Sequence, residues 1–259
     1  MDSETRALTQ QLQHAQCCPQ LVLFKACTTS TNDDVRHYAE QGLQTVLVCS
    51  TQQTHGRGQR QRQWASPKGN IYLSTLVETN IAINGKLALE IGLNLLQIPA
   101  LDNLALSLKW PNDLYSTQGK WGGILVEPIS STQAIVGIGI NLMNHDALPQ
   151  DQAITSLSML GLDLGSCTSH AALDFIVEIY QAVLSAVQWF NYGSQNLAAR
   201  FNHHAAFMQQ AVSLETTEQR VEGIFQGIDA QGRLQILTVN GVEQFYHGRL
   251  RAQPTQEWA

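Results

Sequence analysis

Short strand-like segments dominate the first half of this 259-residue chain and constrain its fold more than any other feature. Apolar runs rich in β-branched residues lie at 21–27, 45–50, 71–78, 105–110, 121–129 and 133–143. Helical patterns interrupt them only at 1–16, 32–41 and 86–97. A doubly wound fold would alternate strands and helices more regularly, so the pattern predicts an α+β fold with a mixed or mostly antiparallel sheet.

The pattern changes in the second half of the chain. An amphipathic helix is predicted at 168–190 and a second helix at 193–207. Short strands separated by glycine-containing turns follow, which is typical of a small β-barrel. We expect a main domain over residues 1–206, including a short extension at 1–20, and a small domain over 207–259.

Composition excludes several classes of protein. The 15 Lys and Arg against 21 Asp and Glu give 15 − 21 = −6, which disfavours a dedicated nucleic-acid binder. There is no apolar run of the ~18 residues that a membrane span needs, and the amino terminus lacks the pattern of a signal peptide, so we expect a cytoplasmic protein without a membrane partner. The five cysteines show neither disulfide nor zinc spacing, and we expect reduced thiols.

The scarce positive charge is unevenly distributed. Arg57, Arg60, Arg62 and Lys68 share the polar, glycine-containing segment 51–70, which has no helical or strand period. A loop of that length inside a compact domain is usually functional or disordered, and here strands are predicted on both sides of it. The cluster is either a solvated basic surface or a local site for a small anion, and the neighbouring glycines and tryptophan favour the site.

Several motifs occur in a characteristic order. They are TSTND at 29–33, GRGQRQRQW at 56–64, KWPNDLY at 109–115, GKWGGILVE at 119–127 and GIGINL at 137–142. In combination they resemble the biotin protein ligases, which attach biotin to carboxylase subunits. The resemblance covers the chain from about residue 21 and implies a class II synthetase-like catalytic domain with a small C-terminal SH3-like barrel. Too few residues precede the first strand for the winged helix-turn-helix of bifunctional members, so we expect a monofunctional ligase.

The resemblance also implies a reaction in two steps. Biotin and ATP, with Mg²⁺, would give biotinyl-AMP and pyrophosphate, and a lysine of the biotin carboxyl carrier protein of acetyl-CoA carboxylase would then attack the acyl adenylate. The first step needs positive charge where two anions approach, and donors that stabilise charge developing on the phosphate. No motif assigns the metal ligands.

Individual roles follow from the matching positions. The resemblance implies catalytic roles for Lys120, which would bridge carboxylate and phosphate, for Arg57, and for Asp113, which would position or deprotonate the incoming lysine. It implies biotin contacts for Ser30, Thr31, Asn32, Gln53, Arg57, Gly58, Gln59, Lys120, Gly137 and Gly139. It implies ATP contacts for Gly56, Arg57, Gly58, Arg60, Arg62, Trp64, Lys109, Asn112 and Asn141.

Alternatives remain open at this point. Ser30 and Thr31 could simply cap a helix, and Trp64 could be a packing anchor. A lipoate or octanoyl ligase has similar chemistry, and a non-catalytic biotin sensor would bind without transfer. The GRG and KWPND segments favour a biotin ligase over a lipoate ligase, and the intact Lys120 and Asp113 disfavour the sensor.

The chain departs from the usual family pattern, GRGRxGRxW, at two positions of the loop. Gln59 replaces an Arg, and Gln61 replaces a Gly. Loss of the cation should weaken retention of the adenylate unless Arg60 or Arg62 compensates, and loss of the glycine should restrict the loop backbone.

Overall fold

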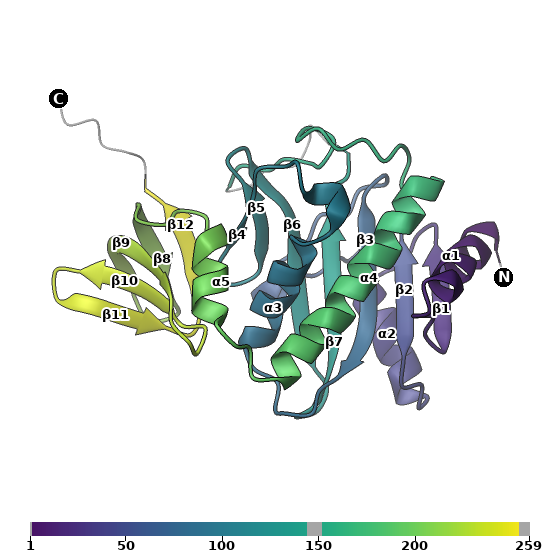
Figure 1. The fold of residues 1–259 in the computed structure, drawn as a ribbon, viewed down its shortest axis with the longest axis horizontal. Coiled ribbons are helices and arrows are strands. Elements are labelled where there is room, and N and C mark those ends of the chain that lie inside the picture. The colour runs from purple at the N-terminus through teal and green to yellow at the C-terminus, as the bar shows by residue number, and fades with distance from the viewer. Residues whose placement is uncertain (1, 144–151, 254–259) are drawn as a thin grey trace.

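The computed structural model describes residues 2–143 and 152–253 and contains two sheets (Figure 1). The helices are α1 (Ser3–His14), α2 (Thr31–Glu40), α3 (Lys86–Leu95), α4 (His170–Asn191) and α5 (Leu197–His204), with short 3-10 turns at Gln59–Gln61 and Pro99–Leu101. Seven strands form the first sheet: β1 (Leu21–Lys25), β2 (Val46–Ser50), β3 (Ile71–Glu78), β4 (Leu106–Lys109), β5 (Asp113–Ser116), β6 (Gly119–Pro128) and β7 (Gln133–Ile140).

The seven-stranded sheet has the order β1-β2-β3-β7-β6-β5-β4. Only β1 and β2 pair in parallel, and each remaining neighbouring pair is antiparallel. The predicted α+β class with a mixed, mostly antiparallel sheet is therefore confirmed. The strand β5 was not predicted, because it is only four residues long and follows the PND turn directly.

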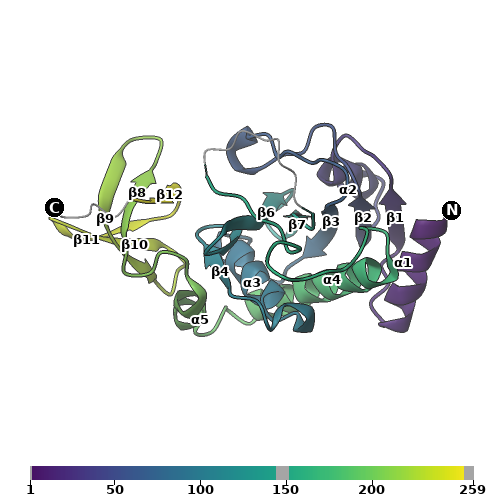
Figure 2. The ribbon, with the colours of Figure 1, turned by 90° about the horizontal axis from the view of Figure 1, so that it is seen from above.

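Helices cover both faces of this sheet. Figure 2 shows α3 and α4 on one face and α2 on the other. Successive side chains of β2 point to opposite faces of the sheet, and both sets are apolar because helices cover both faces. Val46 and Val48 pack with Val35 of α2, whereas Leu47 and Cys49 join the core beneath α3 and α4. By length and composition α4 could also span a membrane, but much of it is buried within the fold, as expected of a core helix.

The second sheet contains five antiparallel strands in the order β11-β10-β9-β8-β12. They are β8 (Ala211–Glu215), β9 (Arg220–Ile228), β10 (Leu234–Thr238), β11 (Gly241–Phe245) and β12 (Arg249–Ala252). The predicted C-terminal β-sheet domain is confirmed, although β12 was missed because RLRA is short and half charged. The proposed boundary near residue 206 stays a prediction.

Specific polar contacts fix the second sheet to the first part of the chain. The Trp110 indole donates to the carbonyl of Gly232 at 3.0 Å. Asn202 of α5 donates to the carbonyl of Ile228 and accepts from its N–H, at 3.2 and 2.7 Å. These bonds are made by the end of β9 and the turn after it, and residues 248–250 of the same sheet line a cavity together with the turn between β4 and β5.

Candidate active site

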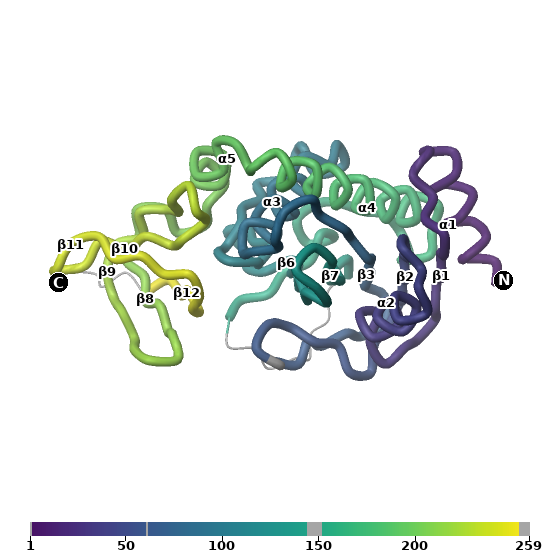
Figure 3. The backbone as a smooth tube through the Cα atoms, turned by 90° about the horizontal axis from the view of Figure 1, so that it is seen from below, coloured from purple at the N-terminus to yellow at the C-terminus, as the bar shows by residue number. Residues whose placement is uncertain are grey.

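One cavity of about 660 Å³ collects most of the predicted residues. Its walls come from the N-terminus of α2, the loop 51–70, strands β6 and β7, the turn after β4, and residues 248–250 of the second sheet. Figure 3 shows the loop on the side of the sheet away from α3 and α4. The volume suits a ligand of cofactor size.

The loop over the cavity is a small hairpin held by its own backbone. Trp64 N–H donates to the carbonyl of Gly56 at 2.9 Å, and Gly58 N–H donates to the carbonyl of Arg62 at 2.8 Å. Arg60 at the tip has φ 57°, in the left-handed region that disfavours residues with a Cβ. The left-handed conformation is at Arg60, next to Gln61, and the backbone restriction expected from Gln61 stays a prediction.

The start of α2 presents hydroxyl and amide groups to the cavity. Ser30 occupies the N-cap position but makes no side-chain cap bond, so simple capping does not account for its hydroxyl. Thr31 donates through its backbone N–H to Gln53 Oε1 at 2.9 Å, and Gln53 Nε2 donates to Ser66 at 3.0 Å. Ser66 in turn donates to the carbonyl of Trp64 at 3.1 Å, which ties α2 to the loop.

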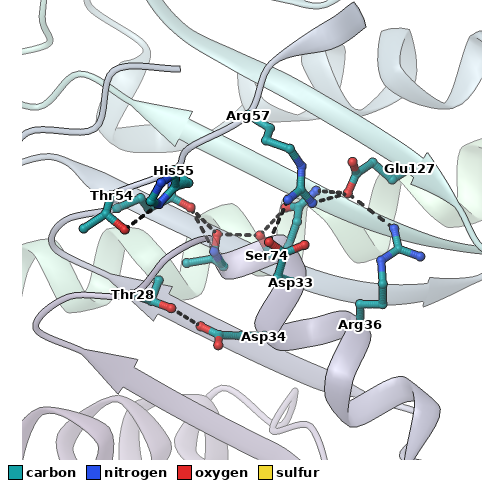
Figure 4. A network of polar contacts seen from close by, with 12 residues as sticks. Thr28, Asp33, Asp34, Arg36, Thr54, His55, Arg57, Ser74 and Glu127 are labelled. Atoms are coloured by element: carbon teal, nitrogen blue, oxygen red, sulfur yellow. Dashed lines mark hydrogen bonds and ion pairs between the residues drawn. The ribbon is translucent and has the colours of Figure 1, made fainter. Parts of the chain in front are cut away.

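The Arg57 guanidinium is held between two carboxylates. Nη1 lies 2.7 Å from Asp33 and Nη2 lies 3.3 Å from Glu127 (Figure 4). The hydrogen bond to Asp33, with the further attraction of Glu127, raises the pKa of Arg57 against the opposing effect of burial. An anionic ligand would therefore have to compete with Asp33 and Glu127 for this cation, which the sequence did not predict.

Two lysines share one largely buried aspartate, Asp113, in the wall of the cavity. Lys120 Nζ lies 2.5 Å from Asp113 Oδ1, and Lys109 Nζ lies 3.1 Å from Oδ2 and donates to Gln152. Burial opposes ionisation of Asp113, but the two lysines outweigh it and lower its pKa. Burial also lowers the pKa of Lys109, against the attraction of Asp113. A carboxylate with a lowered pKa is a weak base, so this geometry favours positioning over deprotonation for Asp113.

Trp64 lies across the glycines of β6 and β7. A Cβ atom on Gly139 would be 2.7 Å from its Nε1, and one on Gly123 would be 3.3 Å from its ring. Lys120 Nζ is 4.8 Å from the ring centroid, and the buried Nε1 has no hydrogen-bond partner among the described residues. A bound ligand that used the space over Gly139 would have to displace this indole.

Most of the predicted site residues line the cavity. Those that do are Ser30, Thr31, Asn32, Gln53, Arg57, Gly58, Gln59, Arg60, Arg62, Trp64, Lys109, Asn112, Asp113, Lys120, Gly137 and Gly139. Gly56 and Asn141 are not among the lining residues. Gly56 packs against Ser66 and the Trp64 carbonyl, where a Cβ would be 2.4 Å from Ser66 Oγ.

Asn141 lies outside the cavity lining, and its predicted contact with adenine stays a prediction. Its amide nitrogen donates to the carbonyls of Lys120 and Thr155, at 3.4 and 3.1 Å, and so holds two segments of backbone together. Conversely, the sequence analysis missed Arg249, Gln152 and Glu127. Arg249 and Gln152 line the cavity, and Glu127 binds Arg57 from just outside it. Glu127 ends the motif at 119–127, but nothing in that motif shows that its partners are Asn32, Arg36 and Arg57, and no local pattern marks Arg249 or Gln152.

The described residues do not form a resident magnesium site. They contain no group of three or more His, Cys, Asp or Glu side chains that could hold a metal ion. Asp113 is the one carboxylate among the described residues that line the cavity, and it is already bound by two lysines. Magnesium prefers oxygen ligands in octahedral geometry, and this donor set does not supply them. We therefore assign no magnesium ligand.

Comparison with known proteins identifies the class of this fold and site. Residues 24–141 match the biotin/lipoate A/B protein ligase family, and residues 209–249 match the biotin protein ligase C-terminal domain. The biotin–[acetyl-CoA-carboxylase] ligases of Mycobacterium tuberculosis and Paracoccus denitrificans are 30% and 31% identical, over 81% of this chain in each case and 80% and 91% of theirs. The chain belongs to the biotin protein ligase family, whose enzymes ligate biotin.

Other comparisons agree with this assignment. The bifunctional ligase/repressor BirA of Escherichia coli is 30% identical over 73% of this chain, and the match spans 60% of that protein. The solved biotin protein ligase of Aquifex aeolicus in complex with biotin and ATP superposes with a TM-score of 0.74 at 24% identity, covering 90% of this chain and all of that one. At this identity the superposition supports the fold alone.

Proposed function

We propose that this enzyme activates biotin with ATP as biotinyl-5′-AMP and transfers the biotinyl group to a lysine of a biotin carboxyl carrier protein. The observation that carries the proposal is that one cavity joins the TSTND, GRG and KWPND segments with Lys120. The names of the relatives support the carrier protein of acetyl-CoA carboxylase as acceptor. ATP as co-substrate fits a cytoplasmic location.

The polar groups at the start of α2 suit the ureido ring of biotin. A ureido group needs hydrogen-bond donors for its carbonyl and acceptors for its two N–H groups. Ser30, Thr31, Asn32 and Gln53 line this part of the cavity and supply both kinds. Gly137 lies against Asn32, and Gly58 and Gln59 border the same space from the loop.

The cations suit the two anions that meet in the first step. A carboxylate oxygen of biotin attacks the α-phosphorus of ATP, and the bond to the β-phosphate breaks with release of pyrophosphate. Lys120 would bridge the biotin carboxylate and the α-phosphate, and Arg57 would turn from Asp33 and Glu127 toward the same group. Negative charge is redistributed over the carboxylate and phosphate oxygens in the transition state. Cations already positioned beside these oxygens therefore stabilise the transition state more than the bound substrates.

The remaining nucleotide contacts come from both sides of the cavity. Arg60 and Arg62 would approach the phosphates from the loop, and Lys109 and Asn112 from the turn after β4. Trp64, once displaced from Gly139, would cover the nucleotide and exclude water that hydrolyses the adenylate. Arg249 of β12 lies close enough to Lys109 to act on its pKa, and it adds positive charge at this end.

The second step transfers the biotinyl group. The neutral amine of the acceptor lysine attacks the acyl carbon, the bond to AMP breaks, and the amine gives up a proton. Asp113 is held by Lys120 and Lys109, so we assign it the role of fixing these two cations and the approaching lysine. Deprotonation of the amine is left to solvent or to the AMP phosphate that departs.

The test is biotin-dependent exchange of labelled pyrophosphate into ATP, in wild type and in Lys120→Ala. We expect kcat for exchange to fall about 10²-fold or more while the Kd of biotin changes much less, because the charge interaction grows in the transition state. Lys68→Ala, in the exposed part of the same basic loop, is the matched control and should be silent. An unchanged rate in Lys120→Ala would remove Lys120 from the mechanism, and exchange with lipoate in place of biotin would favour the alternative ligase.

A further inference from the structure

Glu127 lies near the end of β6, and side-chain nitrogens of three residues lie close to one of its carboxylate oxygens, Oε2. Asn32 Nδ2 donates to Oε2 at 2.8 Å, Arg57 Nη2 lies at 3.3 Å, and Arg36 Nη2 lies at 3.6 Å. Figure 4 shows Glu127 between the two arginines. The side chain is 24% exposed and the residue does not line the cavity, so Glu127 reaches the site only through its neighbours.

Asn32 is the neighbour whose orientation depends on Glu127. An amide side chain can present either its oxygen or its nitrogen, and an ionised carboxylate accepts hydrogen bonds only. Glu127 therefore fixes Nδ2 toward itself and Oδ1 toward Ser74, whose hydroxyl lies at 2.5 Å. Asn32 is only 4% exposed and lies against Gly137, where a Cβ would be 2.2 Å from Oδ1, so it has little room to turn.

This orientation is passed on to Thr31. Ser74 Oγ lies 2.5 Å from Asn32 Oδ1 and 2.7 Å from Thr31 Oγ1, but it has a single proton. Since Oδ1 can only accept, the Ser74 proton points to Asn32. The Thr31 hydroxyl also lies 3.1 Å from Gln53 Oε1. The shorter 2.7 Å contact between two hydroxyl oxygens needs a proton between them, so we take the Thr31 hydroxyl to donate to Ser74 and Gln53 Oε1 to accept from the Thr31 backbone N–H. Every donor in the series Thr31, Ser74, Asn32 then points toward Glu127. The lone pairs of Thr31 Oγ1 are left for a ligand N–H.

We infer that Glu127 is a positioning residue for biotin: its carboxylate orients Asn32 and, through Ser74, Thr31 for the ureido ring. The inference rests on the proposed placement of biotin at the start of α2. Burial makes the effect strong, because Thr31, Asn32 and Ser74 are at most 4% exposed and water cannot replace a lost partner.

The second contact of Glu127 predicts which substrate is affected. Arg57 keeps Asp33 at 2.7 Å when the charge of Glu127 is removed, so the loop retains an anchor. Asn32 has no second carboxylate among its hydrogen-bond partners in the described residues. Loss of the Glu127 charge should therefore weaken biotin binding and leave ATP binding almost unchanged.

The experiment measures pyrophosphate exchange and biotin calorimetry with Glu127→Gln. An amide at this position can face Asn32 with oxygen or nitrogen, so the orientation is no longer imposed. A charge-assisted bond is about twice as strong as a neutral one, and we expect the Kd and KM of biotin to rise about five- to tenfold. The KM of ATP should change less than about twofold, whereas a general loss of structure would raise the KM of both substrates.

Two further variants isolate the path through Asn32. Arg36→Gln removes the other exposed partner of Glu127 without touching Asn32 and should leave the KM of biotin unchanged. In the Asn32→Ala background, Glu127→Gln should cause no additional loss. The inference would be overturned if Glu127→Gln left the KM of biotin unchanged or raised the KM of ATP alone. It would also be overturned if Glu127→Gln weakened biotin binding as much in the Asn32→Ala background as in wild type. Wild-type protein without biotin-dependent exchange would instead overturn the proposed function.

Discussion

Gly137 offers a direct test of the proposed biotin site, because its backbone lies against Asn32. A Cβ atom on residue 137 would be 2.2 Å from Asn32 Oδ1, whereas carbon and oxygen atoms that touch are usually about 3.3–3.6 Å apart. In Gly137→Ala the Asn32 side chain must therefore move by about 1 Å. Asn32 is 4% exposed and is held by Glu127 at 2.8 Å and by Ser74 at 2.5 Å, so a shift of this size cannot keep both bonds, and we expect the bond to Glu127 to be lost.

The expected loss follows from the strength of that bond. A hydrogen bond to a charged group contributes about 1.5–3 kcal/mol, which corresponds to roughly a 10- to 150-fold rise in the Kd of biotin. Calorimetric titration of biotin into wild type and Gly137→Ala measures it directly. Gly85→Ala is the matched control, because a Cβ on Gly85 meets no atom within 4 Å.

Stability must be followed in parallel, since overpacking costs about 1–3 kcal/mol in folding. Binding is therefore compared at a temperature where thermal unfolding shows both proteins folded. A biotin Kd in Gly137→Ala equal to that of wild type would refute the placement of biotin beside Asn32. An equal loss in Gly85→Ala would show that the effect is not local.

The remaining predictions concern the loop 51–70 and Asp113. Gln59→Arg should slow the release of labelled biotinyl-AMP several-fold to about tenfold, because a charged donor replaces a neutral one. Arg60→Ala should speed release in the wild-type background but hardly change it in the Gln59→Arg background. If neither substitution changes the release rate, backbone groups alone hold the intermediate. Burial opposes ionisation of Asp113, but Lys120 and Lys109 lower its pKa below 3.8 in the folded protein. The ionised side chain therefore stabilises the fold at pH values above the pKa of the unfolded chain, and this stabilisation is lost as the pH falls through the lower pKa of the folded protein. Urea unfolding of wild type and Asp113→Asn should give a constant difference from about pH 8 to 5 that shrinks below about pH 4, and a difference that already shrinks near pH 6 would contradict the lowered pKa.

Sequence periodicity predicted the fold wherever apolar residues were numerous. Strands such as β3 and β7 and the helices α3 and α4 were found close to their observed positions, because each buries a continuous apolar face. The strands β5 and β12 were missed, since four residues with polar or charged side chains carry little periodic signal. Pairing with neighbouring strands places both in their sheets: β5 pairs with β4 across a turn, and β12 pairs with β8, which is distant in the sequence.

The site was predicted from motifs, but its charge balance was not. The motifs indicated Arg57 and Lys120 as cations available to an anion, whereas the structure pairs them with Glu127 and Asp113. Asn141 falls within a motif yet uses its amide to hold backbone together. Such pairings depend on which strands become neighbours, and a local sequence window contains no information about them.

The position of β12 at the cavity has a practical consequence for attaching the enzyme to other molecules. Residues 248–250 form part of the cavity wall, so a tag, fusion partner or surface linker joined just after Ala252 would be close to the cavity. Helix α1 lies at the opposite end of the molecule from the second sheet (Figure 1). Immobilisation or fusion through the amino end should therefore leave the cavity open to large acceptors.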